Sequence, residues 1–380
     1  MMQSLSSSRA SAKRTSSQRR PFAPSAVPPA VRVRGEAHAS AAISRRTAAA
    51  AFALLQPTAQ SLSCSGLAAA GPVRNVMAAA APSAAGASAI PAGSPANLDL
   101  LVVGPGVLGS VLAKNWLASV PGSTATGLTN TDRSHERLRS MGITPATRAS
   151  LTAGRRYSFV AFSAPPSGSQ DYEGDIKAAL SLWDGTGSFV FTSSMSVCSV
   201  DDGGTVTDAN CPLVARGAGP STDKLLAAED VAGGNVLRLV GLYHATRGAH
   251  TYFMKVVNVP RPAGYVVNLL HYEDAAGMAA AILRGDGSGP FRGRVFLGAD
   301  GHPIRFDDMI EACFSTGVFP RVPVNFTGSL PEGGKSGLGK VVDASASLAA
   351  LGGWAPKYAS FQVFMAAGGK DFYNTSGIAF

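Results

Sequence analysis

Three glycines with the spacing of a phosphate-binding turn lie just after residue 100. Gly104, Gly106 and Gly109 follow a run at residues 99–103 that is rich in strand-forming residues, and they open a segment whose apolar residues recur at helical spacing. In a strand, turn and helix of this kind, the first glycine permits the tight turn, the second admits a pyrophosphate, and the third lets helix pack on strand. The phosphates then lie at a helix N-terminus, which favours an anion. The spacing predicts a dinucleotide site, with a plain glycine-rich turn as the alternative.

Other cofactor contacts are expected where strands end, because a ligand of an open parallel sheet lies beyond the carboxyl ends of its strands. The residues expected there, besides the glycines, are Val107, Leu108, Thr129, Asn130, Arg133, Ser163, Ala164 and Thr192. NAD enzymes usually carry an acid about 20 residues past the glycines, which binds the ribose hydroxyl. Here the tip of the second strand offers Thr129, Asn130 and Thr131, with no acid, and Asp132 and Arg133 follow slightly later. This pattern favours NADP over NAD, unless Arg133 merely flanks the next helix.

The elements that must position these residues alternate along the chain. Strands are expected at residues 99–103, 124–129, 158–163, 188–192, 235–240, 265–270 and 293–298, and helices at 134–141, 172–183, 225–231, 275–283 and 305–314. Alternation of this kind is typical of a parallel sheet with helices on both faces. We therefore expect an α/β, Rossmann-type doubly wound sheet with a smaller C-terminal substrate lobe, preceded by a disordered leader. The boundaries are 1–96 for the leader, 97–245 for the nucleotide-binding domain, 246–366 for the lobe with returning sheet elements, and 367–380 for a tail.

The net charge of +9 belongs to the leader alone. Residues 1–96 carry ten basic residues and one acid, Glu36, so residues 97–380 hold 23 basic and 23 acidic residues. A neutral folded part argues against a nucleic-acid partner. The Ser-, Ala- and Arg-rich leader has the composition of a transit peptide, which predicts the chloroplast stroma. The alternative is the thylakoid lumen, because Arg45 and Arg46 precede a short apolar run as in a twin-arginine signal. No run has the 18 or so apolar residues of a membrane span.

Four cysteines, Cys64, Cys198, Cys211 and Cys313, include no CxxC pair. This spacing predicts neither a metal site nor a disulfide framework. Cys198 and Cys211 could approach each other across one loop, with two ordinary thiols as the alternative.

Four segments in order along the chain carry a family resemblance: FVFTSSMSV at 189–197, RLVGLY at 238–243, NLLHYEDAA at 268–276 and GWAPKY at 353–358. Together they resemble extended short-chain dehydrogenases/reductases, in particular the atypical branch of plant and bacterial NAD(P)-binding, epimerase-like proteins. The resemblance covers about residues 97–364, nearly the whole of the expected folded part.

The resemblance implies hydride transfer in which a Tyr moves the proton, a Lys four residues later lowers the pKa of that Tyr, and a Ser orients the carbonyl. Ser194 and Lys224 match the Ser and the Lys, but Pro220 stands where the Tyr is expected. Without that Tyr, the alternative is that Lys224 is only a solvated residue at the start of a helix. The alternative for Ser194 is that it caps the turn after the strand. Other candidate proton donors are Tyr243 and His250, in a loop whose aromatic residues could instead pack the lobe on the main domain.

The sequence thus predicts an NAD(P)-dependent oxidoreductase or epimerase-like enzyme acting on a small polar substrate whose identity, like the oligomeric state, it does not reveal. A non-catalytic cofactor-binding assembly, scaffold or RNA-associated protein is the alternative, because the Tyr is missing while the glycines are present. An isomerase or lyase that keeps its nicotinamide bound is a third hypothesis.

Overall fold

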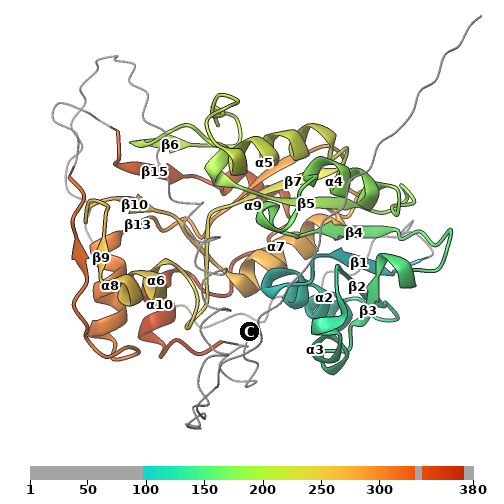
Figure 1. Ribbon diagram of the computed structural model, residues 1–380, viewed down its shortest axis with the longest axis horizontal. Helices are drawn as coiled ribbons and strands as arrows, with labels where there is room; N and C mark the ends of the chain where they lie inside the picture. The colour runs from blue at the N-terminus through green and yellow to red at the C-terminus, as the bar shows by residue number, and fades with distance from the viewer. Residues whose placement is uncertain (1–96, 330–335, 372–380) are drawn as a thin grey trace, which may run out of the picture. The chain divides into compact units, whose positions relative to one another are not determined.

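A seven-stranded parallel sheet is the centre of the computed structural model, which describes residues 97–329 and 336–371 (Figure 1). The strands lie in the order β12, β7, β5, β4, β1, β2, β3, and every adjacent pair is parallel. Their bounds are β1 Leu100–Val103, β2 Ala125–Thr129, β3 Thr144–Thr147, β4 Phe159–Phe162, β5 Phe189–Ser194, β7 Asn235–Leu239 and β12 Val295–Gly298. The predicted fold class is confirmed. The proposed leader at 1–96 and most of the tail lie outside the described residues.

The order of the strands reverses between β1 and β4. From β1 the chain moves outward to β2 and β3, then returns to β4 on the other side of β1 and moves outward again. Crossovers therefore leave in opposite directions beyond the carboxyl ends of β1 and β4, which opens a crevice there. The glycine turn follows β1 directly, so it lies at this crevice.

Helices cover both faces of the sheet, as the alternation of side chains along β1 requires. Leu100 and Val102 belong to one buried cluster, with residues of α2 (Val107–Ser119) and α7 (Tyr272–Arg284). Leu101 and Val103 belong to another, with residues of α4 (Tyr172–Leu180) and α5 (Pro220–Val231). Successive residues of a strand point to opposite faces, so one apolar run supplies both cores. None of the helices in residues 97–329 and 336–371 is both long and apolar enough to cross a bilayer.

Most predicted elements lie within a few residues of the observed ones, two predicted elements have other bounds, and several short strands and helices were not predicted, among them β3. β3 was not predicted, because it is short, lies at the sheet edge and contains Pro145, which edge strands tolerate. α5 begins at Pro220, five residues before the predicted start, since proline suits the first turn of a helix. The strand predicted at 265–270 is divided into β10 (Val266–Val267) and β11 (Leu269–His271).

The C-terminal half builds smaller sheets beside the main one. A four-stranded sheet has the order β13, β10, β15, β6, and two strand pairs are β11 with β8 and β14 with β9. The remaining strands are β6 Asp202–Val206, β8 Gly241–Tyr243, β9 Asn258–Val259, β13 Ile304–Arg305, β14 Asn325–Phe326 and β15 Gly339–Val342. The remaining helices are α3 His135–Ser140, α6 Ala249–Val256, α8 Phe306–Ser315, α9 Ser345–Ala350 and α10 Phe361–Ala366. A third buried cluster, rich in aromatic residues of α6, α8 and α10, fills this lobe.

Candidate functional site

The three glycines of the turn have three different surroundings. Gly104 has a φ of +78°, and a Cβ built there would lie 2.5 Å from Ala164 Cα. A Cβ on Gly109 would lie 2.5 Å from Ser163 Oγ and 2.7 Å from Val102 Cγ1, so only glycine fits against the sheet. A Cβ on Gly106 would have no neighbour within 4 Å. Gly106 also precedes the first residue of α2, whose N-terminus has no side-chain cap. The backbone is therefore open at Gly106 and closely packed on either side of it.

Residues after β4 hold this turn in place. The Ser163 N–H donates to Val103 O at 2.8 Å, and its hydroxyl donates to Gly104 O at 3.0 Å. The Ala164 carbonyl accepts a hydrogen bond from the Tyr172 hydroxyl at 2.7 Å. Thr192 is one strand further away, where its hydroxyl donates to Phe162 O at 3.2 Å. Ser163 and Ala164 thus lie against the turn, and Thr192 joins β5 to β4.

The tip of β2 carries two of the predicted residues in exposed positions. Asn130 and Arg133 are exposed, while the Thr129 hydroxyl is 2.8 Å from His135 Nε2. The residue that reaches the turn is Arg137, which the sequence analysis did not name. Its guanidinium donates to Pro105 O and to Ser110 Oγ, each at 3.1 Å. Arg137 follows Arg133 by one helical turn, which is the sequence signal that could have indicated it.

Ser194 and Lys224 are both engaged with nearby backbone. Ser194 ends β5, and its hydroxyl oxygen accepts a hydrogen bond from the Ser196 N–H at 3.1 Å, which caps the short turn η4 (Met195–Val197). The Lys224 ammonium donates to Ser169 O at 2.6 Å, in the loop after β4. Pro220 is the first residue of α5, so no phenol lies one turn before Lys224. The lysine therefore ties α5 to the loop beside the crevice.

Tyr243 and His250 lie inside the third buried cluster. The Tyr243 ring is fully buried between Phe361 and Phe364, at centroid distances of 4.9 and 5.5 Å, and burial raises the pKa of its hydroxyl. His250 is also fully buried, with Nε2 2.9 Å from Ala245 O, and burial lowers its pKa to about 4. Both side chains pack the lobe and neither is exposed to a ligand.

A polar pair at the ends of β8 and β11 is more accessible. These strands run parallel, with Tyr243 opposite His271, so the residues that follow them come together. The Tyr272 hydroxyl accepts a hydrogen bond from Arg247 Nε at 3.0 Å, and both side chains are partly exposed. Tyr272 is the first residue of α7, which packs beside α2. A phenol whose oxygen accepts from a guanidinium still has its own proton to donate, so this pair is suited to proton transfer.

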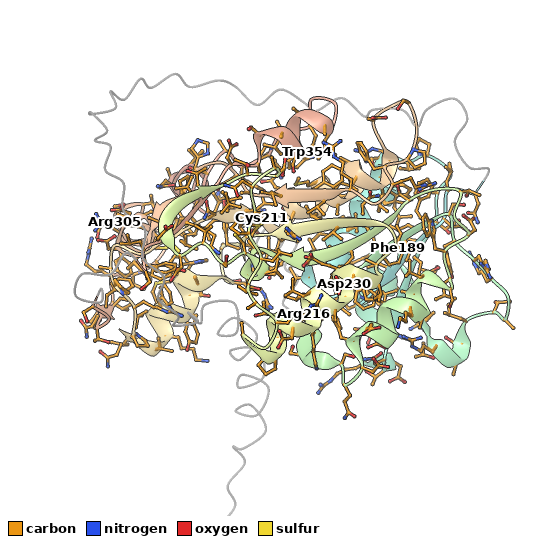
Figure 2. All side chains as sticks on the ribbon, turned by 90° about the horizontal axis from the view of Figure 1, so that it is seen from above. Phe189, Cys211, Arg216, Asp230, Arg305 and Trp354 are labelled. Atoms are coloured by element: carbon orange, nitrogen blue, oxygen red, sulfur yellow. The ribbon has the colours of Figure 1, made fainter. Side chains whose placement is uncertain are left out.

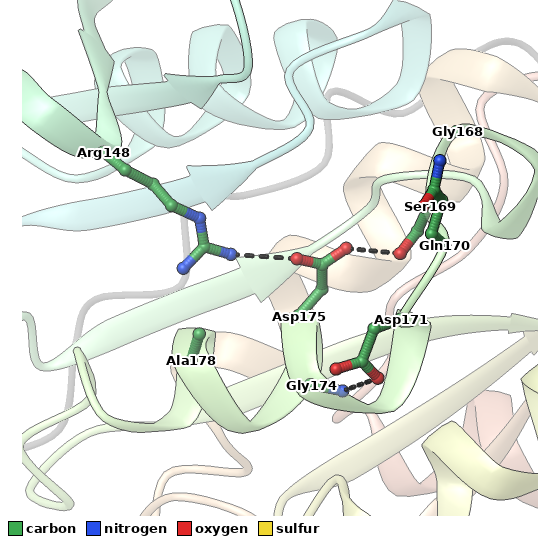
Figure 3. Close-up of a pocket in the computed structure, with 8 residues that line it drawn as sticks. All are labelled: Arg148, Gly168, Ser169, Gln170, Asp171, Gly174, Asp175 and Ala178. Carbon is green, nitrogen blue, oxygen red and sulfur yellow. Dashed lines mark hydrogen bonds and ion pairs between the residues drawn. The ribbon is translucent and has the colours of Figure 1, made fainter. Parts of the chain in front are cut away.

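A polar hollow of about 390 Å³ lies between the loop after β4, the first turns of α4 and Arg148 (Figure 3). Arg148 closes one side through an ion pair with Asp175 at 3.1 Å, and Ser169 donates to the same carboxylate at 2.6 Å. Asp171 caps α4 by accepting from the Gly174 N–H at 2.8 Å. A second hollow of about 550 Å³ lies between α8 and residues 321–326. Ser169 also joins the first hollow to α5, because its carbonyl oxygen accepts the hydrogen bond from Lys224.

Comparison with known proteins identifies the fold. It is that of the NAD-dependent epimerases and dehydratases, although no family model and no curated protein matches the sequence. A functionally unknown conserved protein from Silicibacter pomeroyi DSS is similar with a TM-score of 0.54 and 22% identity, over 71% of this chain and 97% of that one. UDP-glucose 4-epimerase from Thermotoga maritima, with UDP-glucose, gives 0.54 and 13%, over 73% and 99%. dTDP-glucose 4,6-dehydratase from Bacillus anthracis, in complex with NAD, gives 0.55 and 13%, over 71% and 95%.

Proposed function

We propose that the protein binds a nicotinamide dinucleotide over the turn at residues 104–109 and acts as an epimerase-like oxidoreductase. The observation that carries this proposal is the open backbone at Gly106, between two glycines that are packed too closely for any side chain. A pyrophosphate needs such an approach, and the N-terminus of α2 behind it favours an anion. The complex of the similar dehydratase with NAD supports the same cofactor class.

NADP is the form that the surroundings favour. Arg137 lies against Pro105 in the turn, and Arg133 is exposed at the start of the same helical segment. The adenosine ribose of a dinucleotide lies between the glycine turn and the tip of the second strand in this fold, so these cations are suited to a 2′-phosphate. The tip residues Thr129 and Asn130 carry no charge that would oppose it.

Because Pro220 stands where the tyrosine is expected, catalysis on a small polar substrate would need another proton donor. The cofactor would supply the hydride chemistry when bound. The chain would supply the proton from Tyr272, whose oxygen is held by Arg247, while the Ser194 hydroxyl proton is available to a carbonyl oxygen. The leader composition supports a place in the chloroplast stroma for this activity.

A non-catalytic, cofactor-dependent assembly role is the second candidate. It is favoured by Pro220 at the position of the proton donor and by Lys224, whose ammonium is held by the Ser169 carbonyl. In this role the bound dinucleotide would stabilise a surface for a partner and would not turn over.

Titration of the full-length protein with NADPH and with NADH, followed by cofactor fluorescence, tests the proposal. We expect saturable binding of both, with NADPH the tighter. Absence of binding for both at near-millimolar concentration would overturn the proposed function. Bound NADPH that an extract of small metabolites oxidises supports the enzyme, and NADPH that stays reduced favours the assembly role.

A further inference from the structure

Two cysteines on either side of one short loop lie on facing segments beside β5. Residues 197–199 and 212–214 pair in antiparallel fashion, with Cys198 opposite Leu213. The Ser199 N–H donates to Pro212 O at 2.8 Å, and the Val214 N–H donates to Val197 O at 2.9 Å. Cys211 is two residues before Leu213, so it lies diagonally across from Cys198 and on the same face of the pair.

The two thiols contact each other. Both are free, and a hydrogen bond joins their side chains. That bond lowers the pKa of Cys198 and raises the pKa of Cys211, so Cys211 is the donor and negative charge gathers on Cys198. The pair therefore shares one proton between two sulfurs, as reactive dithiols do.

Cations on two other elements favour the charged form of this pair. Arg238, on β7, donates from Nη1 to Cys211 Sγ at 3.4 Å (Cys211 is labelled in Figure 2). Lys340, on β15, donates from Nζ to the Cys198 carbonyl at 2.7 Å. Burial lowers the pKa of Lys340, and the charge of Cys198 acts against that effect. A thiolate beside positive charge is a nucleophile at neutral pH, whereas an isolated buried thiol is not.

We propose that Cys198 and Cys211 form a redox-active dithiol that a low-molecular-weight disulfide converts into an intramolecular disulfide. Diagonal neighbours in an antiparallel pair have Cα atoms about 7–8 Å apart. A disulfide needs about 4.4–6.8 Å, so closure requires a shift of the order of 1–2 Å. The segment that carries Cys211 can make this shift, because Pro212 and Leu213 are exposed and Cys211 itself is partly exposed.

The reaction runs in two exchange steps. Cys198, on which the negative charge gathers, attacks one sulfur of the small disulfide, which releases one thiolate. Cys211 then gives its proton to that thiolate, and its sulfur attacks Cys198, breaking the mixed disulfide and releasing the second thiol with a proton from solvent. Two electrons pass from the cysteines to the small disulfide, and a dithiol reductant reverses both steps.

Oxidation of the two cysteines would affect the contacts at the end of β5. Arg238, which donates to Cys211, also donates to both carboxylate oxygens of Glu229 at 2.7 to 3.3 Å. The Glu229 carboxylate in turn accepts a hydrogen bond from the Ser193 hydroxyl at 2.5 Å. Ser193 is next to Ser194 and Thr192. A disulfide sulfur carries no charge, so closing it weakens the attraction that holds Arg238 at this point.

Thiol mapping of the full-length protein tests the proposal without any cofactor. The protein is incubated with glutathione disulfide, alkylated and digested, and the peptides are identified by mass spectrometry. We expect Cys198 and Cys211 to lose alkylation together and to appear as one cross-linked peptide pair, while Cys313 stays alkylated. Cys313 is a control for Cys198 because both are buried, yet burial alone raises the pKa of Cys313 to about 12. Dithiothreitol is expected to restore alkylation at both sites.

A second measurement keeps the proposal falsifiable if a variant folds poorly. With Cys211→Ser, we expect Cys198 to retain glutathione as a mixed disulfide, because its resolving partner is gone. Wild-type protein in which both cysteines remain alkylated, or in which either pairs preferentially with Cys64 or Cys313, would overturn the proposal. The outcome does not depend on cofactor binding, so it is separate from the test of the proposed function.

Discussion

A methyl group added to the glycine turn has a different effect at Gly104 and at Gly106. At Gly104 it meets the backbone of Ala164 at 2.5 Å, and the φ of +78° is one that alanine rarely adopts. At Gly106 it enters open space and disturbs only what binds there. Gly122 is a matched control, because it has a φ of +76° with no neighbour within 4 Å of its Cβ.

The sizes of these effects follow from the contacts. Left-handed backbone costs a residue with a side chain about 1–2 kcal/mol, which is the whole expected loss for Gly122→Ala. Gly104→Ala adds overpacking of about 1–3 kcal/mol, so its unfolding free energy falls by about 2–5 kcal/mol in total. Gly106→Ala loses at most about 1 kcal/mol, the difference between glycine and alanine before a helix. Its affinity for NADPH falls at least about tenfold, or about 1.4 kcal/mol, because the methyl group keeps the pyrophosphate from the backbone.

Urea unfolding and a fluorescence titration with NADPH, performed on the three variants and the wild type, measure both quantities. Two results would refute the reasoning. One is a Gly106→Ala protein that binds NADPH as tightly as the wild type, and the other is a Gly104→Ala protein as stable as Gly122→Ala.

Three further predictions concern charged residues. Arg137→Gln should weaken NADPH binding about tenfold or more and leave NADH nearly unchanged, and a larger loss with Arg133→Gln would assign the role to Arg133 instead. Asp300 is 6% exposed, and burial raises its pKa to about 7 from 3.8. The folded protein therefore loses up to about 4 kcal/mol of stability from this group as the pH rises from 4 to above 7, and Asp300→Asn should remove that part of the slope in urea unfolding at pH 5 and pH 8. Asp371→Ala should cost about 1–3 kcal/mol, because it leaves the buried Ala245 N–H without its acceptor at 3.1 Å, and Asp371→Asn should recover part of the loss; equal losses would contradict this.

The sequence was sufficient for the features that depend on local pattern. The central strands β1 and β4 are short apolar runs that are wholly buried, and the glycines that follow β1 lie in the turn that their spacing predicted. β3 was missed because a four-residue edge strand with Pro145 has almost no local signal.

The roles of side chains were harder to predict when distant segments decide them. Tyr243 was expected to be a candidate proton donor, but the residues that enclose it, Phe361 and Phe364, come more than a hundred positions later. Arg137 was missed because it lies beyond the strand tip in the sequence. The sequence does not show that α3 brings its guanidinium back to the Pro105 carbonyl. The contact between Cys198 and Cys211 was left open, since a loop of that length permits many conformations.

Hydrogen exchange of the full-length protein with and without NADPH tests the central claim most directly, because it locates the cofactor. We predict slower exchange in peptides that cover the glycine turn and the start of α2 (104–112), and in those that cover the tip of β2 with α3 (128–138). Unchanged exchange in both regions at saturating NADPH, with protection confined to other parts of the chain, would contradict a dinucleotide site over Gly104, Gly106 and Gly109.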